Sequence, residues 1–328
     1  MTTLEPAIEW SPTVEASALL ILTRGQVATA LEGAELLEPL AQALISYSRG
    51  EASAPPRVAA QAPGGWLGAM PAFVPGVALG AKLITVFPAN AAANVPSHQG
   101  MVALFDGETG MPLCVIDAGL LTAVRTAAVS ALSVRELARP GPWVLAILGS
   151  GEQARAHLEL VPSVGGVSEL RLAARNPVRA QEVADRVPGC RVFASFESAV
   201  RGADVVLCCT DSPDPVLRRS WLGPGVHVVS VGMGSELDRE TVRQGRLFVE
   251  WMGALSSPPP AGARELQGLD PGAATELGDV LTRSGRGRRS DEELTVFKST
   301  GLGVEDVAVA QAVYQAARLR GLGVELAW

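Results

Sequence analysis

Apolar and polar positions follow two different periods along this chain. After a short apolar run at residues 19–22, residues 25–47 repeat Leu and Ala at intervals of three and four, which is typical of a helix with one buried side. From residue 55 to residue 117 the sequence pattern changes to short apolar runs separated by Pro, Gly and Asn. This pattern predicts strands joined by turns. An Ala-rich helix is expected over residues 122–137, ended by Pro140–Gly141.

A second pattern of strand, turn and helix then repeats along the middle of the chain. We expect its strands at residues 143–148, 169–173, 192–194, 205–209, 226–231 and 247–250. Strands that alternate with helices predict an α/β fold with a doubly wound parallel sheet of the Rossmann type. Residues 303–320 are expected to form a final Ala-rich helix.

Length and charge narrow the class of protein. A chain of 328 residues is too long for one ordinary core and suits two domains. The net charge of −7 argues against nucleic acid as the partner. No apolar run reaches the roughly 20 residues of a membrane span, and residues 1–17 lack the pattern of a signal peptide.

Four cysteines, Cys114, Cys190, Cys208 and Cys209, show no metal-binding spacing. We therefore expect a cytoplasmic protein with reduced, buried thiols and no metal site.

A glycine-rich turn is the clearest indication of a binding site in the sequence. The apolar run Trp143–Leu148 leads into Gly149–Ser150–Gly151–Glu152–Gln153–Ala154, and a helix-forming run follows. In a dinucleotide site the first glycine permits a tight turn, and the second lets the backbone approach the pyrophosphate at the helix N-terminus. Ala154 takes the third small position. The alternative is an ordinary strand–helix turn that happens to contain two glycines.

The end of the next expected strand bears on the choice of cofactor. An acidic residue there would bind the ribose hydroxyls of NAD, but this chain has Ala174–Arg175–Asn176, with Arg179 one turn later. Arg175 can pair with a 2′-phosphate, so NADP(H) is favoured and NAD(H) remains possible. The alternative is that Arg175 only stacks on the adenine.

At Arg125–Ala131, followed by residues 147–157, the chain resembles the ornithine cyclodeaminase/mu-crystallin family. Further matching motifs fall in family order at Pro56–Arg57, Leu67–Pro71, Lys82 before Val86–Pro88, Pro96–Gly100, Thr275–Gly278 and Val296–Gly301. The resemblance implies a smaller α+β domain for substrate binding and dimerisation at residues 1–125, completed by 303–328. Residues 126–302 would form the Rossmann domain, and the protein would be a homodimer.

Members of the family exchange a hydride between a nicotinamide and a small α-imino or α-amino acid. The resemblance places the substrate carboxylate at Arg57, Lys82 and Arg125, with Met70 also in the substrate site. A carboxylate needs such a cationic clamp. Each cation has an alternative reading as a solvated charge, weakest for Lys82 because its strand is otherwise apolar.

Catalytic roles are expected for Lys82 and His98. His98 matches a position near the nicotinamide, where it would hydrogen-bond the cofactor or help protonate the imine. A buried histidine with a backbone partner is the alternative, and neither His157 nor His227 is a candidate. Further cofactor contacts implied by the resemblance are at Thr126, Thr210, Val231, Met233, Lys298 and Ser299, although Lys298 also reads as a surface lysine.

Two departures from the family pattern change the expected reaction. Ornithine-handling members carry a Glu where this chain has Gly68, as in mu-crystallin, and an acid in the loop that is shortened here to residues 232–237. Cyclodeamination needs such groups for proton transfer. We therefore expect an NAD(P)H-dependent reductase of a small α-imino acid or cyclic ketimine.

Two alternatives stay open. One is an ornithine cyclodeaminase that uses Glu236 or Asp238 in place of the missing acid. The other is a non-catalytic protein that binds NADPH and a ligand. Residues 251–269 match no motif and could be a plain loop or a dimer contact.

Overall fold

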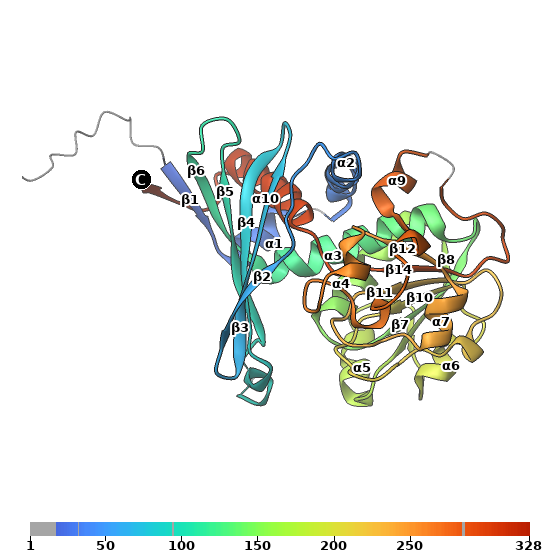
Figure 1. The fold of residues 1–328 in the computed structure, drawn as a ribbon. Helices are drawn as coiled ribbons and strands as arrows, with labels where there is room; N and C mark the ends of the chain where they lie inside the picture. The colour runs from blue at the N-terminus through green and yellow to red at the C-terminus, as the bar shows by residue number, and fades with distance from the viewer. Residues whose placement is uncertain (1–17, 32, 94, 284–285) are drawn as a thin grey trace, which may run out of the picture.

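The computed structural model describes residues 18–328, with the exception of 32, 94, 284 and 285. Residues 1–17, which bear on the expected absence of a signal peptide, lie outside the described residues. Two β-sheets stand side by side with helix α3 (Ala118–Leu137) between them (Figure 1).

The first sheet has seven strands in the order β15-β1-β6-β5-β4-β3-β2. Neighbouring strands are antiparallel except for β1 and β6. The strands are β1 (Ala18–Leu22), β2 (Val58–Ala62), β3 (Gly65–Val74), β4 (Ala78–Val86), β5 (His98–Phe105), β6 (Pro112–Asp117) and β15 (Val324–Ala327). Strands were expected in this region, but β15 was not.

The helical run expected over residues 25–47 is broken into α1 (Arg24–Ala30), the 3₁₀ turn η1 (Gly33–Leu36) and α2 (Leu37–Ser48). Leu31 has an extended backbone, with ψ at 119°, so α1 ends there. The prediction of one continuous helix was wrong, because periodicity alone does not reveal such a break.

The second sheet has eight strands, all parallel, in the order β13-β12-β14-β11-β10-β7-β8-β9. Its strands are β7 (Trp143–Leu148), β8 (Val167–Ala173), β9 (Cys190–Val192), β10 (Val205–Cys208), β11 (His227–Ser230), β12 (Arg246–Val249), β13 (Ala274–Glu276) and β14 (Thr295–Lys298). Short helices connect them: α4 (Glu152–Leu160), α5 (Pro177–Ala184), α6 (Phe196–Val200), α7 (Arg239–Gln244), α8 (Gly253–Ser256) and α9 (Leu277–Leu281). The predicted α/β fold with a doubly wound parallel sheet is confirmed, and β13 and β14 are additions to it.

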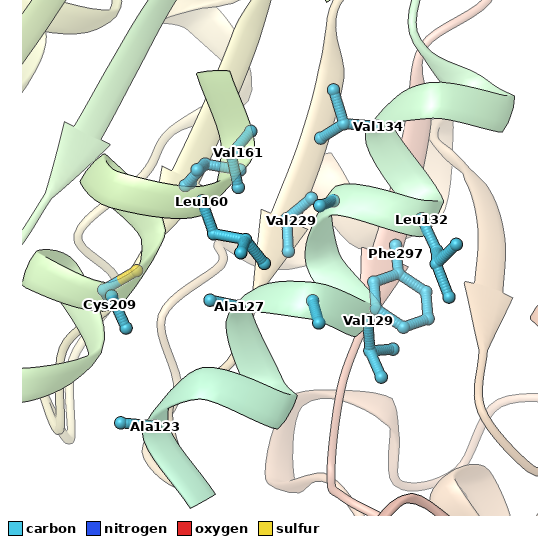
Figure 2. Close-up of a cluster of buried hydrophobic side chains, with 14 of the residues drawn as sticks. Ala123, Ala127, Val129, Leu132, Val134, Leu160, Val161, Cys209, Val229 and Phe297 are labelled. Atoms are coloured by element: carbon cyan, nitrogen blue, oxygen red, sulfur yellow. The ribbon is translucent and has the colours of Figure 1, made fainter. Parts of the chain in front are cut away.

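Helix α3 is buried along most of its length. Small side chains such as Ala127 let it approach Leu160 and Val161 at the end of α4, and its other side meets Phe297 of β14 (Figure 2). This close packing fixes the first sheet relative to the second. Because α3 runs without interruption across residues 125 and 126, the division proposed there falls inside a helix.

Helix α10 (Gly303–Arg320) has the bounds that the sequence predicted. It lies against strands β3, β4 and β5 of the first sheet and against α2 and α3. Its first turn is buried, including the two acidic residues Glu305 and Asp306.

Among the described helices, none is long and apolar enough to cross a membrane. Nor do three or more His, Cys, Asp or Glu side chains gather as metal ligands within the described parts of the chain.

Candidate functional site

A cavity of about 640 Å³ lies where the inner face of the first sheet meets the carboxyl ends of the parallel strands. Ligands bind at this edge of a doubly wound sheet because the loops there are open to solvent. The predicted residues that line the cavity are Arg57, Lys82, His98, Arg125, Thr126, Gly149, Ser150, Gly151, Glu152, Gln153, Ala174, Arg175, Asn176, Arg179, Thr210, Val231, Met233 and Ser299.

The glycine turn has the geometry of a phosphate cradle. Gly149 has a φ of +130°, and a Cβ there would lie 2.4 Å from the backbone oxygen of Cys209, so no other residue fits. At Gly151, by contrast, a Cβ would point into open space. The free backbone at Gly151 and the N-terminus of α4 together fit the pyrophosphate of a dinucleotide.

A carboxylate also lies at this turn. Glu152 opens α4 and forms an ion pair with Arg24 of α1. The ion pair reduces the negative charge that Glu152 would otherwise present to a phosphate.

Two arginines line the cavity beyond the end of β8. The side chain of Asn176 caps α5 by accepting a hydrogen bond from the backbone N of Arg179 at 3.1 Å. The side chains of Arg175 and Arg179 are exposed and make no ion pair within the described residues. Their guanidinium groups are available to a ligand.

A buried cluster of charges occupies the opposite wall. Lys82 Nζ lies 2.8 Å from Asp306 Oδ1, and Arg125 Nε lies 3.0 Å from the same oxygen. Arg125 Nη1 also lies 2.7 Å from Glu305 Oε2. The cations reach the cavity, whereas the two carboxylates stand behind them on α10.

Burial and pairing shift the pKa values within this cluster. Burial lowers the pKa of Lys82 to about 8, although Asp306 opposes the shift. Burial raises the pKa of Asp306, but Lys82 and Arg125 outweigh it and hold that pKa below its ordinary value. Burial, together with the nearby Glu250, raises the pKa of Glu305 well above its ordinary range.

Sequence reasoning missed Glu305 and Asp306. Their only signal in the sequence was that these two acids stand between apolar residues on either side in the chain. Charged residues in such a run are unexpected unless they have a partner. Their partners lie 180 or more residues away in the chain.

Arg57 joins the cluster from the segment before β2. Its Nη2 donates to the backbone oxygen of Thr300 at 3.1 Å, and its Nη1 lies 3.4 Å from that of Pro260. Burial and the nearby Arg125 lower the pKa of Arg57. Its Nε is buried without a hydrogen-bond partner in the described structure, so it retains a donor for a ligand.

Glu250, another residue that the sequence did not single out, holds the segment after β14. Its carboxylate accepts hydrogen bonds from Ser299 Oγ at 2.5 Å, Thr300 N at 2.8 Å and Gly301 N at 3.0 Å. These bonds place Ser299 and Thr300 at the cavity wall beside Arg57.

The strand register explains the hollow beside Lys82. Three rows of side chains cross the inner face of β3, β4 and β5, and they are Trp66–Val86–His98, Gly68–Ile84–Gly100 and Met70–Lys82–Val102. Glycines stand at both ends of the middle row, so no side chain projects from these two positions. At Gly68 the Trp66 indole takes up the space, because a Cβ would lie only 2.7 Å from Trp66 Cζ3, and at Gly100 a Cβ would lie 2.2 Å from the backbone oxygen of Leu83.

Two predicted contacts do not reach this cavity. Met70 shares the row of Lys82 but is buried against the interior and does not line the cavity. Lys298 points away from it: Nζ lies 2.9 Å from Ser230 Oγ, 2.7 Å from Gly232 O and 3.0 Å from Glu265 Oε1. An ammonium has three donors, and here all three are occupied, so the predicted contact of Lys298 with the cofactor does not fit.

The three histidines lie in different surroundings. His98 lines the cavity, with its Nδ1 3.1 Å from Ser97 Oγ. His157 and His227 are buried elsewhere, and burial lowers their pKa values to about 4 and about 3. Both are structural.

The acids considered as substitutes for the missing loop acid are engaged elsewhere. Glu236 is fully buried and accepts hydrogen bonds from Thr210 N at 2.6 Å, Gly232 N at 2.8 Å and Ser230 Oγ at 2.7 Å. Asp238 caps α7 through Thr241 N. Neither residue lines the cavity.

Comparison with known proteins agrees with this geometry. The family model of the ornithine cyclodeaminase/mu-crystallin family matches residues 18–320. The chain belongs to the ornithine cyclodeaminase/mu-crystallin family.

Individual relatives include oxidoreductases. The chain is 39% identical over 290 residues to a ketimine reductase mu-crystallin of Mus musculus, with 85% of this chain and 91% of that protein covered. The solved Δ1-pyrroline-2-carboxylate reductase of Thermococcus litoralis, in complex with NADH and L-proline, superimposes with a TM-score of 0.87 at 28% identity, covering 94% of this chain and all of that one. An archaeal alanine dehydrogenase dimer with bound NAD gives a TM-score of 0.83 at 31% identity, covering 94% and 99%.

Family membership and the cradle at Gly149–Gly151 agree on a nicotinamide dinucleotide as cofactor. The cationic cluster and this cradle face one cavity.

Proposed function

We propose that this protein is an NAD(P)H-dependent reductase of small α-imino acids or cyclic ketimines. The observation that carries the proposal is the position of Arg57, Lys82 and Arg125, which line the same cavity as the Gly149–Gly151 cradle. A wall with several cations suits an anionic substrate, and the cradle suits a dinucleotide.

The cations have separate tasks. Arg125 is held by Glu305 and Asp306, and Arg57 by backbone oxygens, so both guanidinium groups are fixed in place to bind the α-carboxylate. A fixed guanidinium binds a carboxylate with little loss of side-chain entropy. These residues orient the imine carbon, and the cofactor, when bound, supplies the hydride.

Lys82 is proposed as the proton donor. Its pKa of about 8 lies near neutral pH, where an acid is both protonated and able to release its proton. The imine nitrogen gains this proton as the carbon gains the hydride, and the product is an amine. His98 also lines the cavity and is proposed to hydrogen-bond the cofactor or the imine.

The geometry disfavours ornithine cyclodeamination. The position that would carry a Glu is Gly68, and the Trp66 indole fills the space that this side chain would need. Glu236 and Asp238 are committed to structural hydrogen bonds. Among the described residues, the acids that line the cavity are Glu152, which pairs with Arg24, and Asp211, and neither stands at the positions where ornithine-handling members are expected to carry their acids.

A panel of substrates tests the proposal through the absorbance of reduced nicotinamide. We expect oxidation of NADPH or NADH with a cyclic ketimine carboxylate, or with pyruvate and an amine, and no release of proline and ammonia from ornithine. Proline formed from ornithine without net use of cofactor would refute the proposal. Tight NADPH binding without turnover of any imine would favour the non-catalytic binding protein.

The preference for NADP(H) is part of the proposal. Arg175 and Arg179 line the cavity with free guanidinium groups, which suit a 2′-phosphate. Arg175→Glu should weaken NADPH binding by about a hundredfold and NADH binding by less than threefold, because a charge-assisted hydrogen bond to the phosphate is lost. Arg186→Glu, an exposed arginine outside the cavity, is the matched control. Equal losses for both cofactors in Arg175→Glu would contradict the preference.

We further propose a homodimer formed by the first sheet. The face of this sheet away from α10 carries partly exposed apolar side chains, among them Leu67, Leu79 and Met101. Exposed apolar surface of this kind marks an interface. The division into a first domain at residues 1–125 with 303–328 and a Rossmann domain at 126–302 is retained as a proposal, supported by the packing of α10 on the first sheet.

A cytoplasmic location is also proposed. The four cysteines are free, and burial raises the pKa of Cys114 to about 12 and that of Cys190 to about 11. Such thiols are unreactive, which suits a reducing compartment.

A further inference from the structure

A second cavity, of about 270 Å³, adjoins the first. The two share Trp66, Val231, Gly232, Met233, Ser299 and Thr300 as lining residues. Its volume is about nine times the ~30 Å³ that a water molecule occupies in the liquid, so it has room for a side chain of several carbon atoms.

The unassigned segment 251–269 builds the outer wall of this cavity through Pro259, Pro260, Gly262, Ala263 and Arg264. The segment is therefore not a plain loop.

This wall is firmly anchored. Trp251 Nε1 donates to Thr300 Oγ1 at 2.9 Å, and Gln267 Nε2 donates to Ala263 O at 2.9 Å. Glu265, next to Arg264, forms the buried ion pair with Lys298 on β14. The backbone that carries Arg264 is thus tied to the sheet.

The second cavity begins at the proposed carboxylate site. Arg57 contacts the backbone oxygens of Pro260 and Thr300, and both of these residues line the second cavity. A substrate whose α-carboxylate lies on Arg57 has this cavity directly beside it.

The second cavity is lined by both apolar and charged side chains, and this combination favours a particular kind of ligand. Trp66, Val231, Met233 and the two prolines supply apolar surface. The charge of Lys298 is neutralised by Glu265, which leaves Arg264 as the one uncompensated charge among the described lining residues. Its guanidinium is exposed, and no ion pair or hydrogen bond holds its side chain in the described structure.

We propose that the second cavity receives the substrate side chain and that Arg264 selects side chains that end in a carboxylate. The preferred substrates would be dicarboxylic α-imino acids, with the α-carboxylate on Arg57 and Arg125 and the distal one on Arg264. This inference rests on the proposed function for the position of the α-carboxylate. An apolar middle with a cationic end matches a short methylene chain with a terminal anion.

Kinetics with a matched pair of imines test the proposal. Imines are formed from excess methylamine with 2-oxoglutarate and with 2-oxopentanoate, which has the same number of carbons but a methyl end. We expect kcat/KM with NADPH to be at least tenfold higher for 2-oxoglutarate. Arg264→Met should remove most of this difference by lowering only the dicarboxylate value, because a charge-assisted hydrogen bond is lost.

Arg243→Met is the control, since Arg243 is exposed on α7 and lines neither cavity. It should leave both values within twofold. Equal kcat/KM for the two imines in the wild-type protein, or an equal loss for both in Arg264→Met, would overturn the assignment of Arg264.

A binding assay separates this outcome from failure of the proposed function. The keto acids without amine are titrated into the NADPH complex, and the fluorescence of bound NADPH is followed. If no imine is reduced, the reductase proposal fails, but tighter binding of 2-oxoglutarate that Arg264→Met abolishes still supports the subsite. Equal binding of both keto acids would refute the subsite whether or not imines are reduced.

Discussion

Replacement of Asp306 by Asn tests whether Lys82 is the acid of the reaction. Asp306 Oδ1 lies 2.8 Å from Lys82 Nζ and 3.0 Å from Arg125 Nε, and all three side chains are buried. The amide keeps the shape of the side chain and removes its charge. The two cations then face each other without their shared counter-ion.

The size of the effect follows from the electrostatics. Two unit charges about 4 Å apart interact by about 4 kcal/mol at an effective dielectric constant of 20, which corresponds to about three pKa units. Relaxation and water entry reduce this, so we expect the pKa of Lys82 to fall from about 8 by at least about one unit. The loss of one partner from a buried pair should also cost about 3–5 kcal/mol of unfolding free energy.

The assay is the pH dependence of kcat/KM for imine reduction, which reports the free enzyme. The reaction needs Lys82 protonated, so activity should fall as the pH rises through the pKa of Lys82. The fall is expected near pH 8 in the wild-type protein and at pH 7 or below in Asp306→Asn.

Asp238→Asn serves as the matched control, because Asp238 caps α7 outside the cavity. It should change the stability little, because Asn and Asp cap a helix about equally well, and it should leave the alkaline limb unchanged. If Asp306→Asn does not fold, Lys82→Arg gives a second test. An arginine does not release its proton, so kcat/KM should fall and the remaining activity should show no alkaline limb. An alkaline limb at the same pH in the wild-type protein and in Asp306→Asn would refute the role of Lys82.

Three further predictions follow from the structure. Gly151→Val should lower the stability by only about 1 kcal/mol, because Val caps a helix less well than Gly, but should weaken cofactor binding at least about tenfold, since its side chain fills open space at the cradle. Gly149→Ala should instead destabilise the fold by at least about 2 kcal/mol in denaturant unfolding. Because burial holds the pKa values of His157 and His227 at about 4 and about 3, the unfolded chain binds more protons below pH 6.5. Urea unfolding should therefore show a loss of about 2 kcal/mol per histidine between pH 7 and pH 5, and His157→Gln should remove the share of His157. A flat profile in the wild-type protein would contradict this. Met101→Asp, on the exposed sheet face, should convert the proposed dimer to a monomer in light scattering, and a dimer mass that the substitution leaves unchanged would exclude this face as the interface.

The sequence alone determined the features that depend on residues close to one another along the chain. The turn at Gly149 was readable because a tight turn between strand and helix needs glycine, whatever lies elsewhere in the chain. Helix α10 was predicted with its bounds, and the alternation of strands and helices was enough to predict the parallel sheet.

Only the tertiary structure decided which distant side chains meet. Asp306 joins Lys82 across 224 positions, and nothing local to either residue encodes that pairing. Lys298 sits at the expected strand end, yet its side chain turns to Glu265, because the alternation along a strand does not say what covers each face.

Dependence on distant residues also explains why the role of residues 251–269 could not be predicted, since this segment matches no motif. Their role as a cavity wall depends on Arg57, which is about 200 positions earlier and contacts Pro260. Periodicity and turn chemistry are properties of short windows of sequence, whereas a binding site is assembled from loops and strands that only folding brings together.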